Sequence, residues 1–363
     1  MMITSRKQMS MNQVVTLKGL LLPTAVALAL TACGGGGGSG SGSSTPIPPV
    51  TPPIAYAAVA TSVPVLVYAL ADDVAIATQL NASRQGSRSG LLAQSTTLDL
   101  AAHNHTNFLV SNQLVGNDTY LTSTVDGVTG GHYENPSLPG YTGQLPQDRA
   151  TKVGYTGTVS ELVTFGTASG ADCVAAFENT VYHLTQMLSP FMDVGIDFNA
   201  GNGSGSACAI ELGVPTTSLG QLPAAGTLVT FPYAGMTGVA PTFYNQGEAP
   251  NPAPDLPVAG HAVLVSLYTT ATPTLAASDI VVQTFSITPA NGTAVTARLL
   301  ANSGVKLMGG AITVDNTIAV PGELVLLPIV ALTPNTVYNV SFAATVKGAA
   351  VSQKWSFTTG AAN

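Results

Sequence analysis

The spacing of apolar residues changes near residue 214, and this change limits the chain to a fold of two unlike halves. Before it, Val174, Phe177 and Val181 recur at the spacing of an amphipathic helix. After it, Val340 and Phe342 alternate with polar residues, as in a strand with one buried face. We therefore expect an α+β protein, with a mixed first half and an all-β second half.

Helices are predicted in the first half over residues 66–84, from a capping Thr96 to residue 109, and over 171–188, where Ser189-Pro190 ends the helix. Strands are expected to follow at 194–198 and 207–212. The second half has short apolar runs between turn residues, as in a β-sandwich. Its expected strands are residues 227–232, 262–268, 280–286, 294–300, 324–331, 337–343 and 354–359.

The composition allows a core but gives little surface charge. Hydrophobic residues make up 45% of the chain, whereas charged residues make up only 8% and the net charge is −7. No basic patch is visible in the sequence, so nucleic acid is excluded as an expected partner.

The N-terminus has the pattern of a targeting segment. Arg6 and Lys7 precede an apolar run that ends in Leu30-Thr-Ala-Cys33, which resembles a bacterial lipobox. This resemblance predicts a signal peptide over residues 1–32 and acylation of Cys33, with the lipid bilayer as a partner. A general secretory signal that happens to contain Cys33 is the alternative. Gly34, rather than Asp, follows Cys33, which favours the outer membrane or cell surface over the inner membrane.

Residues 33–58 are expected to be a linker, first rich in Gly and Ser and then in Pro. Beyond it, Cys173 and Cys208 remain as a pair. Because an exported protein enters an oxidising compartment, we expect these two cysteines to form a disulfide. Two separate buried thiols are the alternative.

Three segments carry a resemblance to a known family: Gly131-His132-Tyr-Glu, the run Gly154-Tyr-Thr-Gly-Thr-Val-Ser-Glu161, and Phe177-Glu-Asn-Thr-Val-Tyr-His183. They are similar to motifs of the CAP superfamily, also called SCP domains. The resemblance implies a three-layer α-β-α sandwich over residues 59–214. It also implies a shallow cavity in which two histidines and one or two glutamates meet, here His132, Glu161 and His183, with His105 on the helix before them.

This chain departs from the family pattern at two places. Leu162 replaces the family's Asn after Glu161, and Thr180 stands where a second glutamate is expected. Glu178 lies five residues from His183, about 140° further around a helix, so its side chain should face elsewhere. Glu134 could supply the second carboxylate from the loop.

Two imidazoles and a carboxylate support two kinds of chemistry. They can form a hydrogen-bond or proton-relay site for a ligand, made here of His132, Glu161, His183, His105 and Glu134. Alternatively, His132 and His183 can hold Zn²⁺ with an open position for hydrolysis. The hydrogen-bond or proton-relay site requires no cofactor.

The first expectation is therefore a lipoprotein of the cell envelope that binds a small molecule, a lipid or a glycan. One alternative is a metal-assisted hydrolase with His132, Glu161 and His183 as its candidate catalytic residues. The other is a structural envelope protein without a catalytic site. Residues 332–338 and 355–359 resemble the end of bacterial Ig-like surface domains. That resemblance implies an Ig-like sandwich over residues 280–363, with residues 215–279 as a β-rich connecting region.

Overall fold

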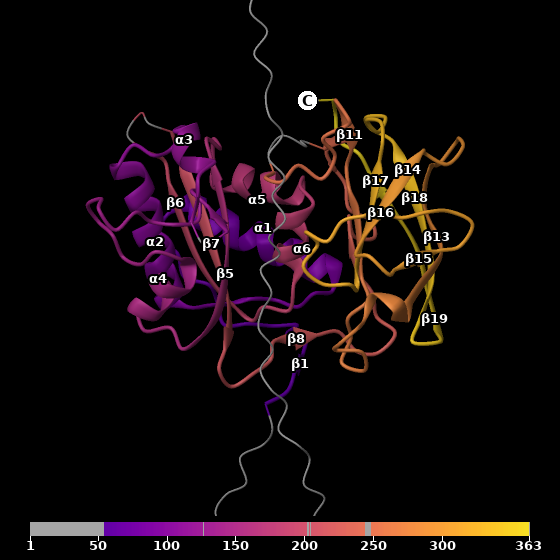
Figure 1. Cartoon of the computed structure of the whole chain (residues 1–363), viewed down its shortest axis with the longest axis horizontal. Coiled ribbons are helices and arrows are strands. Elements are labelled where there is room, and N and C mark those ends of the chain that lie inside the picture. Colours follow the sequence, from indigo (N-terminus) through magenta and orange to yellow (C-terminus); the bar gives the residue numbers. More distant parts are fainter. Residues whose placement is uncertain (1–53, 126, 202, 204, 244–247, 363) are drawn as a thin grey trace, which may run out of the picture. The chain divides into compact units, whose positions relative to one another are not determined.

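A four-stranded sheet in the first half lies between two layers of helices (Figure 1). The computed structural model describes residues 54–125, 127–201, 203, 205–243 and 248–362. The strand order is β2-β6-β7-β5, and β7 pairs antiparallel with both of its neighbours. Helices α2 and α4 cover one face of this sheet, and α1, α5 and α6 cover the other.

The helices are α1 (Ala71–Ser87), α2 (Thr96–Ser111), α3 (Asp118–Leu121), α4 (Pro146–Lys152), α5 (Gly170–Glu178) and α6 (Tyr182–Leu188). The first-half strands are β1 (Ala57–Ala58), β2 (Ala93–Gln94), β3 (Thr124–Val125), β4 (Val128–Thr129), β5 (Gly157–Phe165), β6 (Asp193–Asn199), β7 (Ala207–Pro215) and β8 (Gln221–Leu222).

The ends of the first two helices differ from the predicted ones. Helix α1 begins only at Ala71, next to Asp72 and Asp73, whose negative charges favour a helix N-terminus. Helix α2 is capped by Ser95 rather than by Thr96, because the Ser95 side chain accepts the N–H of Leu98.

The single helix predicted over 171–188 is wrong, because the structure breaks it into α5 and α6. Two contacts account for the break. The Thr180 hydroxyl donates to the carbonyl of Phe177 at 2.6 Å. The Glu248 carboxylate accepts the N–H groups of Val181 and Tyr182, both at 2.7 Å, and so starts a new helix at this point.

Strand β5 was not predicted, and it forms one edge of the sheet. Its side chains alternate between the two faces. The Ser160 hydroxyl accepts a hydrogen bond from Gln186 of α6, and Leu162 packs into the core on that same side. Glu161 and Val163 face α2 and α4 instead. This alternation directs Glu161 into the layer that holds the polar cluster described below.

The second half contains two larger sheets, β16-β14-β17-β12-β9 and β15-β13-β18-β19. One hydrophobic core joins them, with Val265 and Leu326 from the first sheet and Val340 and Phe357 from the second. Strands β9 and β12 pair with their neighbours in the first sheet, although they come from the region predicted to be a connection.

The second-half strands are β9 (Val229–Phe231), β10 (Thr242–Phe243), β11 (Ala259–Gly260), β12 (Val263–Ser266), β13 (Ile280–Pro289), β14 (Ala297–Ala301), β15 (Lys306–Leu307), β16 (Thr313–Val314), β17 (Glu323–Pro328), β18 (Val337–Val346) and β19 (Ala349–Thr358). A short 3₁₀ helix, Ala277–Asp279, precedes β13.

The two halves share a core. Ile76 and Leu184 of the helical layer belong to the same buried cluster as Phe231, Leu264 and Val325 of the second half. Accordingly, Ile54–Asn363 form one compact unit. The fold is α+β, as predicted from the change of periodicity.

The expected disulfide is present between Cys173 of α5 and Cys208 of β7, with the two Cα atoms 6.4 Å apart. It ties a helix of the outer layer to β7, an inner strand of the sheet. Cys33, the expected signal peptide and most of the expected linker lie outside the described residues. Within the described part of the chain, no helix has the length and hydropathy needed to cross a membrane.

Candidate functional site

Glu161 is the centre of a buried polar cluster on the α2/α4 side of the sheet. Its Oε1 atom lies 2.9 Å from Nδ1 of His132, and its other oxygen accepts from the Arg149 guanidinium of α4. Arg149 also donates to the carbonyl of His132 at 3.0 Å. One arginine therefore holds both the carboxylate and the backbone of the histidine that faces it.

His105 of α2 extends this cluster to the neighbouring loop. Its Nε2 atom lies 2.9 Å from the carbonyl oxygen of Gly131, and its Nδ1 atom lies 3.2 Å from the Glu134 carboxylate. Glu134 also accepts the backbone N–H of Thr142 at 2.6 Å and that of Gly143 at 3.3 Å. These bonds tie the loop that carries His132 to α2, so the His132 backbone is held from two sides.

Glu211 is a second buried acid in the cluster, and it faces Glu161 in the register of β5 and β7. Burial, followed by the Glu161 charge, raises the pKa of Glu211 well above its usual range. Burial alone would also raise the pKa of Glu161, but Arg149, His105 and His132 together hold it well below its usual range. The two opposite shifts make Glu161 the ionised member of the pair and favour the protonated form of Glu211.

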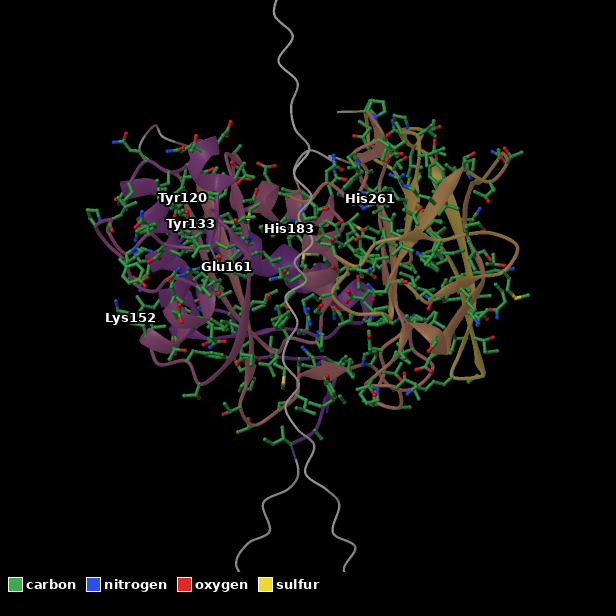
Figure 2. All side chains as sticks on the ribbon, in the orientation of Figure 1. Tyr120, Tyr133, Lys152, Glu161, His183 and His261 are labelled. Carbon is green, nitrogen blue, oxygen red and sulfur yellow. A yellow bond between two sulfur atoms is a disulfide. The ribbon has the colours of Figure 1, made fainter. Side chains whose placement is uncertain are left out.

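His183 lies on α6, and its side chain hydrogen-bonds to a residue outside the Glu161 cluster. Its Nδ1 atom is 3.1 Å from Oε1 of Glu248, the same carboxylate that caps the start of α6. Glu248 is buried. Figure 2 shows His183 between Glu161 and His261 in this view.

A cavity of about 510 Å³ lies beside His183. We call it the histidine cavity. Its lining divides into an apolar part and a polar part. The apolar part is Val163, Phe165, Ala175, Ala176 and Phe177, and the polar part is Thr164, Thr167, Asn179, Thr180 and His183.

The loop of His132 lies against the wall of this cavity. A side-chain carbon added at Gly131 would lie 3.2 Å from the Phe165 ring and 3.4 Å from Val163, both of which line the cavity. His132, the next residue, is therefore held close to the wall, although it does not itself line the cavity. Its side chain is 23% exposed and that of His183 is 22% exposed, so both rings can be reached from outside.

The same tautomer is expected for both histidines. Each Nδ1 faces a buried carboxylate oxygen, which can only accept, so Nδ1 carries the hydrogen of the neutral ring. Each Nε2 atom then keeps its lone pair. No hydrogen bond to either Nε2 is present among the residues that the structure describes.

Four of the five candidate residues thus meet in one cluster, namely His105, His132, Glu134 and Glu161, while His183 pairs with Glu248. Glu178 contacts Ser83 and Gln79 of α1, so it faces away from His183 as expected. Glu134 is bound to His105 and does not supply a carboxylate to His183. In the described segments, no three His, Cys, Asp or Glu side chains are grouped so that they could hold a metal ion.

Three members of the site were missed in the sequence: Arg149, Glu211 and Glu248. The one sequence feature that indicates Glu211 is its charge within the apolar run of β7. For Glu248, which lies 65 residues after His183, we find no local feature that indicates its role.

Comparisons with known proteins add no relative: no protein family model, no curated protein and no solved structure matches this chain.

Proposed function

We propose that this chain is an exported, lipid-anchored protein with a CAP-like first half, which binds a hydroxylated amphiphile in the histidine cavity. The helix–sheet–helix layering and the disulfide support this proposal, as do the lipobox and the linker in the sequence. The second half, with its two sheets, would be an Ig-like spacer or adhesive module.

The observation that carries the proposal is the pair of histidines whose Nδ1 atoms are both held by buried carboxylates. A neutral ring held in this way presents a hydrogen-bond acceptor at Nε2. A ligand hydroxyl can donate to that nitrogen, and the Thr180 and Asn179 side chains lie in the same polar part of the cavity. The apolar part, formed by residues such as Phe165 and Phe177, suits a hydrocarbon chain.

A carboxylate head group would suit this site less well. It carries no proton for the Nε2 lone pair, and it would come close to the negative charge of Glu248. The proposal therefore distinguishes 1-octanol, which has a hydroxyl head, from octanoate, which has the same chain length.

The test is a calorimetric titration of the purified protein with 1-octanol and, separately, with octanoate. We expect 1-octanol to bind more tightly, and His183→Gln to weaken its binding roughly tenfold, the loss of about one hydrogen bond. His103→Gln is the matched control, because His103 is on α2 with a side chain that is 56% exposed. Equal binding of 1-octanol by both variants, with only thermal stability lost in His183→Gln, would favour a purely structural role.

Lipid anchoring is tested separately by Cys33→Ser in the full-length chain. The variant should no longer incorporate labelled fatty acid and should leave the membrane fraction. If the variant stays acylated or stays in the membrane, Cys33 is not the anchor.

A second candidate function is zinc binding through the Nε2 lone pairs of His132 and His183. Metal-bound histidines commonly have their other ring nitrogen hydrogen-bonded to a carboxylate, as His132 and His183 do. Each of these two histidines therefore has the carboxylate partner that zinc-binding histidines commonly have. Glu161 is already occupied by Arg149 and would orient His132 instead of binding the metal. A bound zinc ion would supply Lewis-acid chemistry for hydrolysis.

Zinc titration with the His132→Ala and His183→Ala variants tests this second candidate. Zinc binding that disappears in both variants and remains in His103→Ala would support it. No zinc binding by the unaltered protein, or binding that survives both substitutions, would contradict it.

A further inference from the structure

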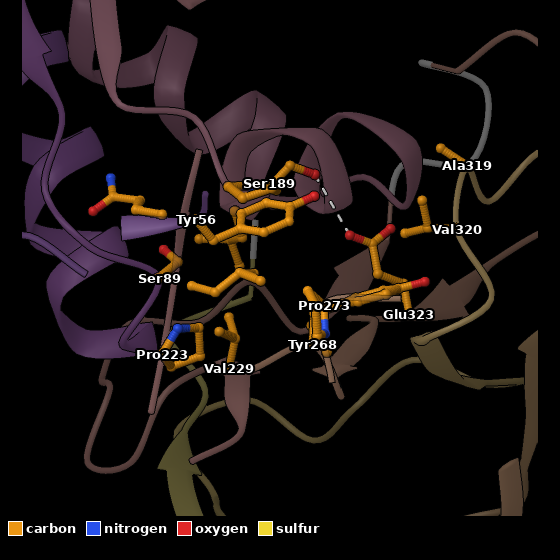
Figure 3. Close-up of a pocket in the computed structure, with 15 residues that line it drawn as sticks. Tyr56, Ser89, Ser189, Pro223, Val229, Tyr268, Pro273, Ala319, Val320 and Glu323 are labelled. Carbon is orange, nitrogen blue, oxygen red and sulfur yellow. Dashed lines mark hydrogen bonds between the residues drawn. The ribbon is translucent and has the colours of Figure 1, made fainter. Parts of the chain in front are cut away.

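A second cavity, of about 150 Å³, lies between residues of the first and second halves and is separate from the histidine cavity (Figure 3). We call it the Glu323 cavity. Leu188 and Ser189 of the α6 end contribute to its wall, together with Tyr56, Tyr268 and Val320. A cavity of this size holds a molecule about as large as benzene.

The Glu323 side chain is the unusual feature of this cavity. It comes from the first residue of β17, is only 4% exposed, and is one of the residues that line the cavity. Its one hydrogen bond within the described residues is from the Ser189 hydroxyl, and that bond is long at 3.5 Å. Figure 3 shows the carboxyl group turned toward Ser189 across the cavity.

No positively charged side chain pairs with Glu323 in the part of the chain that the structure describes. The Arg84 guanidinium donates to the carbonyl oxygens of Ser89 and Ser189, both of which are wall residues. It also donates to the carbonyls of Gly90, Met187 and Phe191. Arg84 is therefore fully used by the backbone. A buried carboxyl without a cation is an expensive arrangement that a bound cation would relieve.

We propose that the Glu323 cavity binds a small primary alkylammonium ion, with the ammonium group on Glu323 and the alkyl chain among the apolar wall residues. An ammonium group has three hydrogens to donate. Glu323 and the Ser189 hydroxyl provide acceptors at one end of the cavity. Tyr56 and Tyr268 also line the cavity and add aromatic side chains, which attract cations, while Leu188 and Val320 suit a short hydrocarbon chain.

The charge state of Glu323 makes this binding depend on pH in a defined direction. Burial raises the pKa of Glu323 to about 8, so the empty site keeps its proton at neutral pH. An ammonium ion needs the ionised carboxylate, so its binding releases that proton and strengthens as the pH rises toward 8. A neutral ligand that binds the protonated acid would weaken over the same range.

The experiment is calorimetric titration of the protein with n-butylammonium chloride and with 1-butanol, a neutral molecule of similar size, at pH 6.5 and pH 8.5. We expect n-butylammonium to bind at least roughly tenfold more tightly at the higher pH. Glu323→Gln should abolish this binding, and 1-butanol should bind weakly at both pH values. The matched control is Glu178→Gln, which changes a buried acid outside this cavity.

Three results would overturn the proposal: no binding of n-butylammonium at pH 8.5, equal binding of 1-butanol, or unchanged binding by Glu323→Gln. The pH comparison uses the unaltered protein, so it decides the question even if the variant is unstable. None of these results bears on the histidine cavity, whose residues are not part of this wall.

Discussion

Glu161 and Glu211 face each other across β5 and β7, and their carboxyl groups have opposite pKa shifts. The difference comes from their partners. Glu161 accepts from Arg149 and His132, whereas neither Glu211 oxygen accepts a hydrogen bond from a donor among the described residues. A protonated Glu211 can donate to Glu161, so the two acids together hold a single negative charge beside Arg149.

The same substitution at these two positions should have unequal effects. Glu211→Gln replaces a neutral acid by an amide of the same shape, so the free energy of unfolding should change by about 1 kcal/mol or less. Glu161→Gln removes the charge that balances Arg149 and should lower it by about 3–5 kcal/mol. Urea unfolding of both variants at pH 7 measures the difference. Equal losses would mean that Glu211 is ionised.

Glu248 should be important for stability although it lies far from its partners in sequence. Its carboxylate accepts from the backbone of Val181, Tyr182 and His183, at 2.7, 2.7 and 3.1 Å. Glu248→Ala leaves those buried donors without a partner, so we expect a loss of about 2–3 kcal/mol. Asp255→Ala is the control, since Asp255 pairs with Arg298 while its side chain is 62% exposed, and it should change little. If the two variants are equally stable, the cap has no energetic importance.

Stability should depend on pH through Glu323. Its pKa is about 8 in the folded protein and near 4.5 in the unfolded chain, so the folded state binds the extra proton between these values. The stabilisation from this group is complete below pH 4.5 and is lost as the pH rises through 8. Relative to Glu323→Gln, the unaltered protein should lose up to about 4 kcal/mol over this window. Thermal unfolding at half-unit pH steps measures it, and parallel curves for the two proteins would contradict the shift.

The disulfide should stabilise the first half by constraining the unfolded chain. Cys173 and Cys208 are 35 residues apart, and replacing both by Ala should lower the free energy of unfolding by about 3–4 kcal/mol in the chain-entropy model. A reducing agent should have a similar effect on the unaltered protein and none on the double variant. Insensitivity of the unaltered protein to reduction would show that the bond contributes little.

Local patterns predicted much of the fold. Helices α1 and α2 and most strands of the second half follow from apolar spacing, because each buries one regular face. Strand β5 was missed because Ser160 and the buried Glu161 interrupt its apolar pattern. The break between α5 and α6 depends on Glu248, whose effect comes from a distant segment and has no trace in the local sequence.

The residues of the candidate site were predictable to about the same extent as the fold. The family resemblance proposed His132 and Glu161 together, and the structure places them 2.9 Å apart. The partner of His183 was not predictable, since a carboxylate from another part of the chain supplies it. Arg149 and Glu211 are buried polar residues whose places beside Glu161 depend on tertiary packing.

We propose that His132 and His183 act in one site through their Nε2 atoms. Long-range ¹H–¹⁵N NMR of histidine-labelled protein, titrated with 1-octanol, tests it directly. We expect hydrogen on Nδ1 in both rings. We also expect their Nε2 resonances to shift together with one dissociation constant, while those of His103 and His261 do not shift. Hydrogen on Nε2 in either ring, or two unrelated dissociation constants, would contradict it.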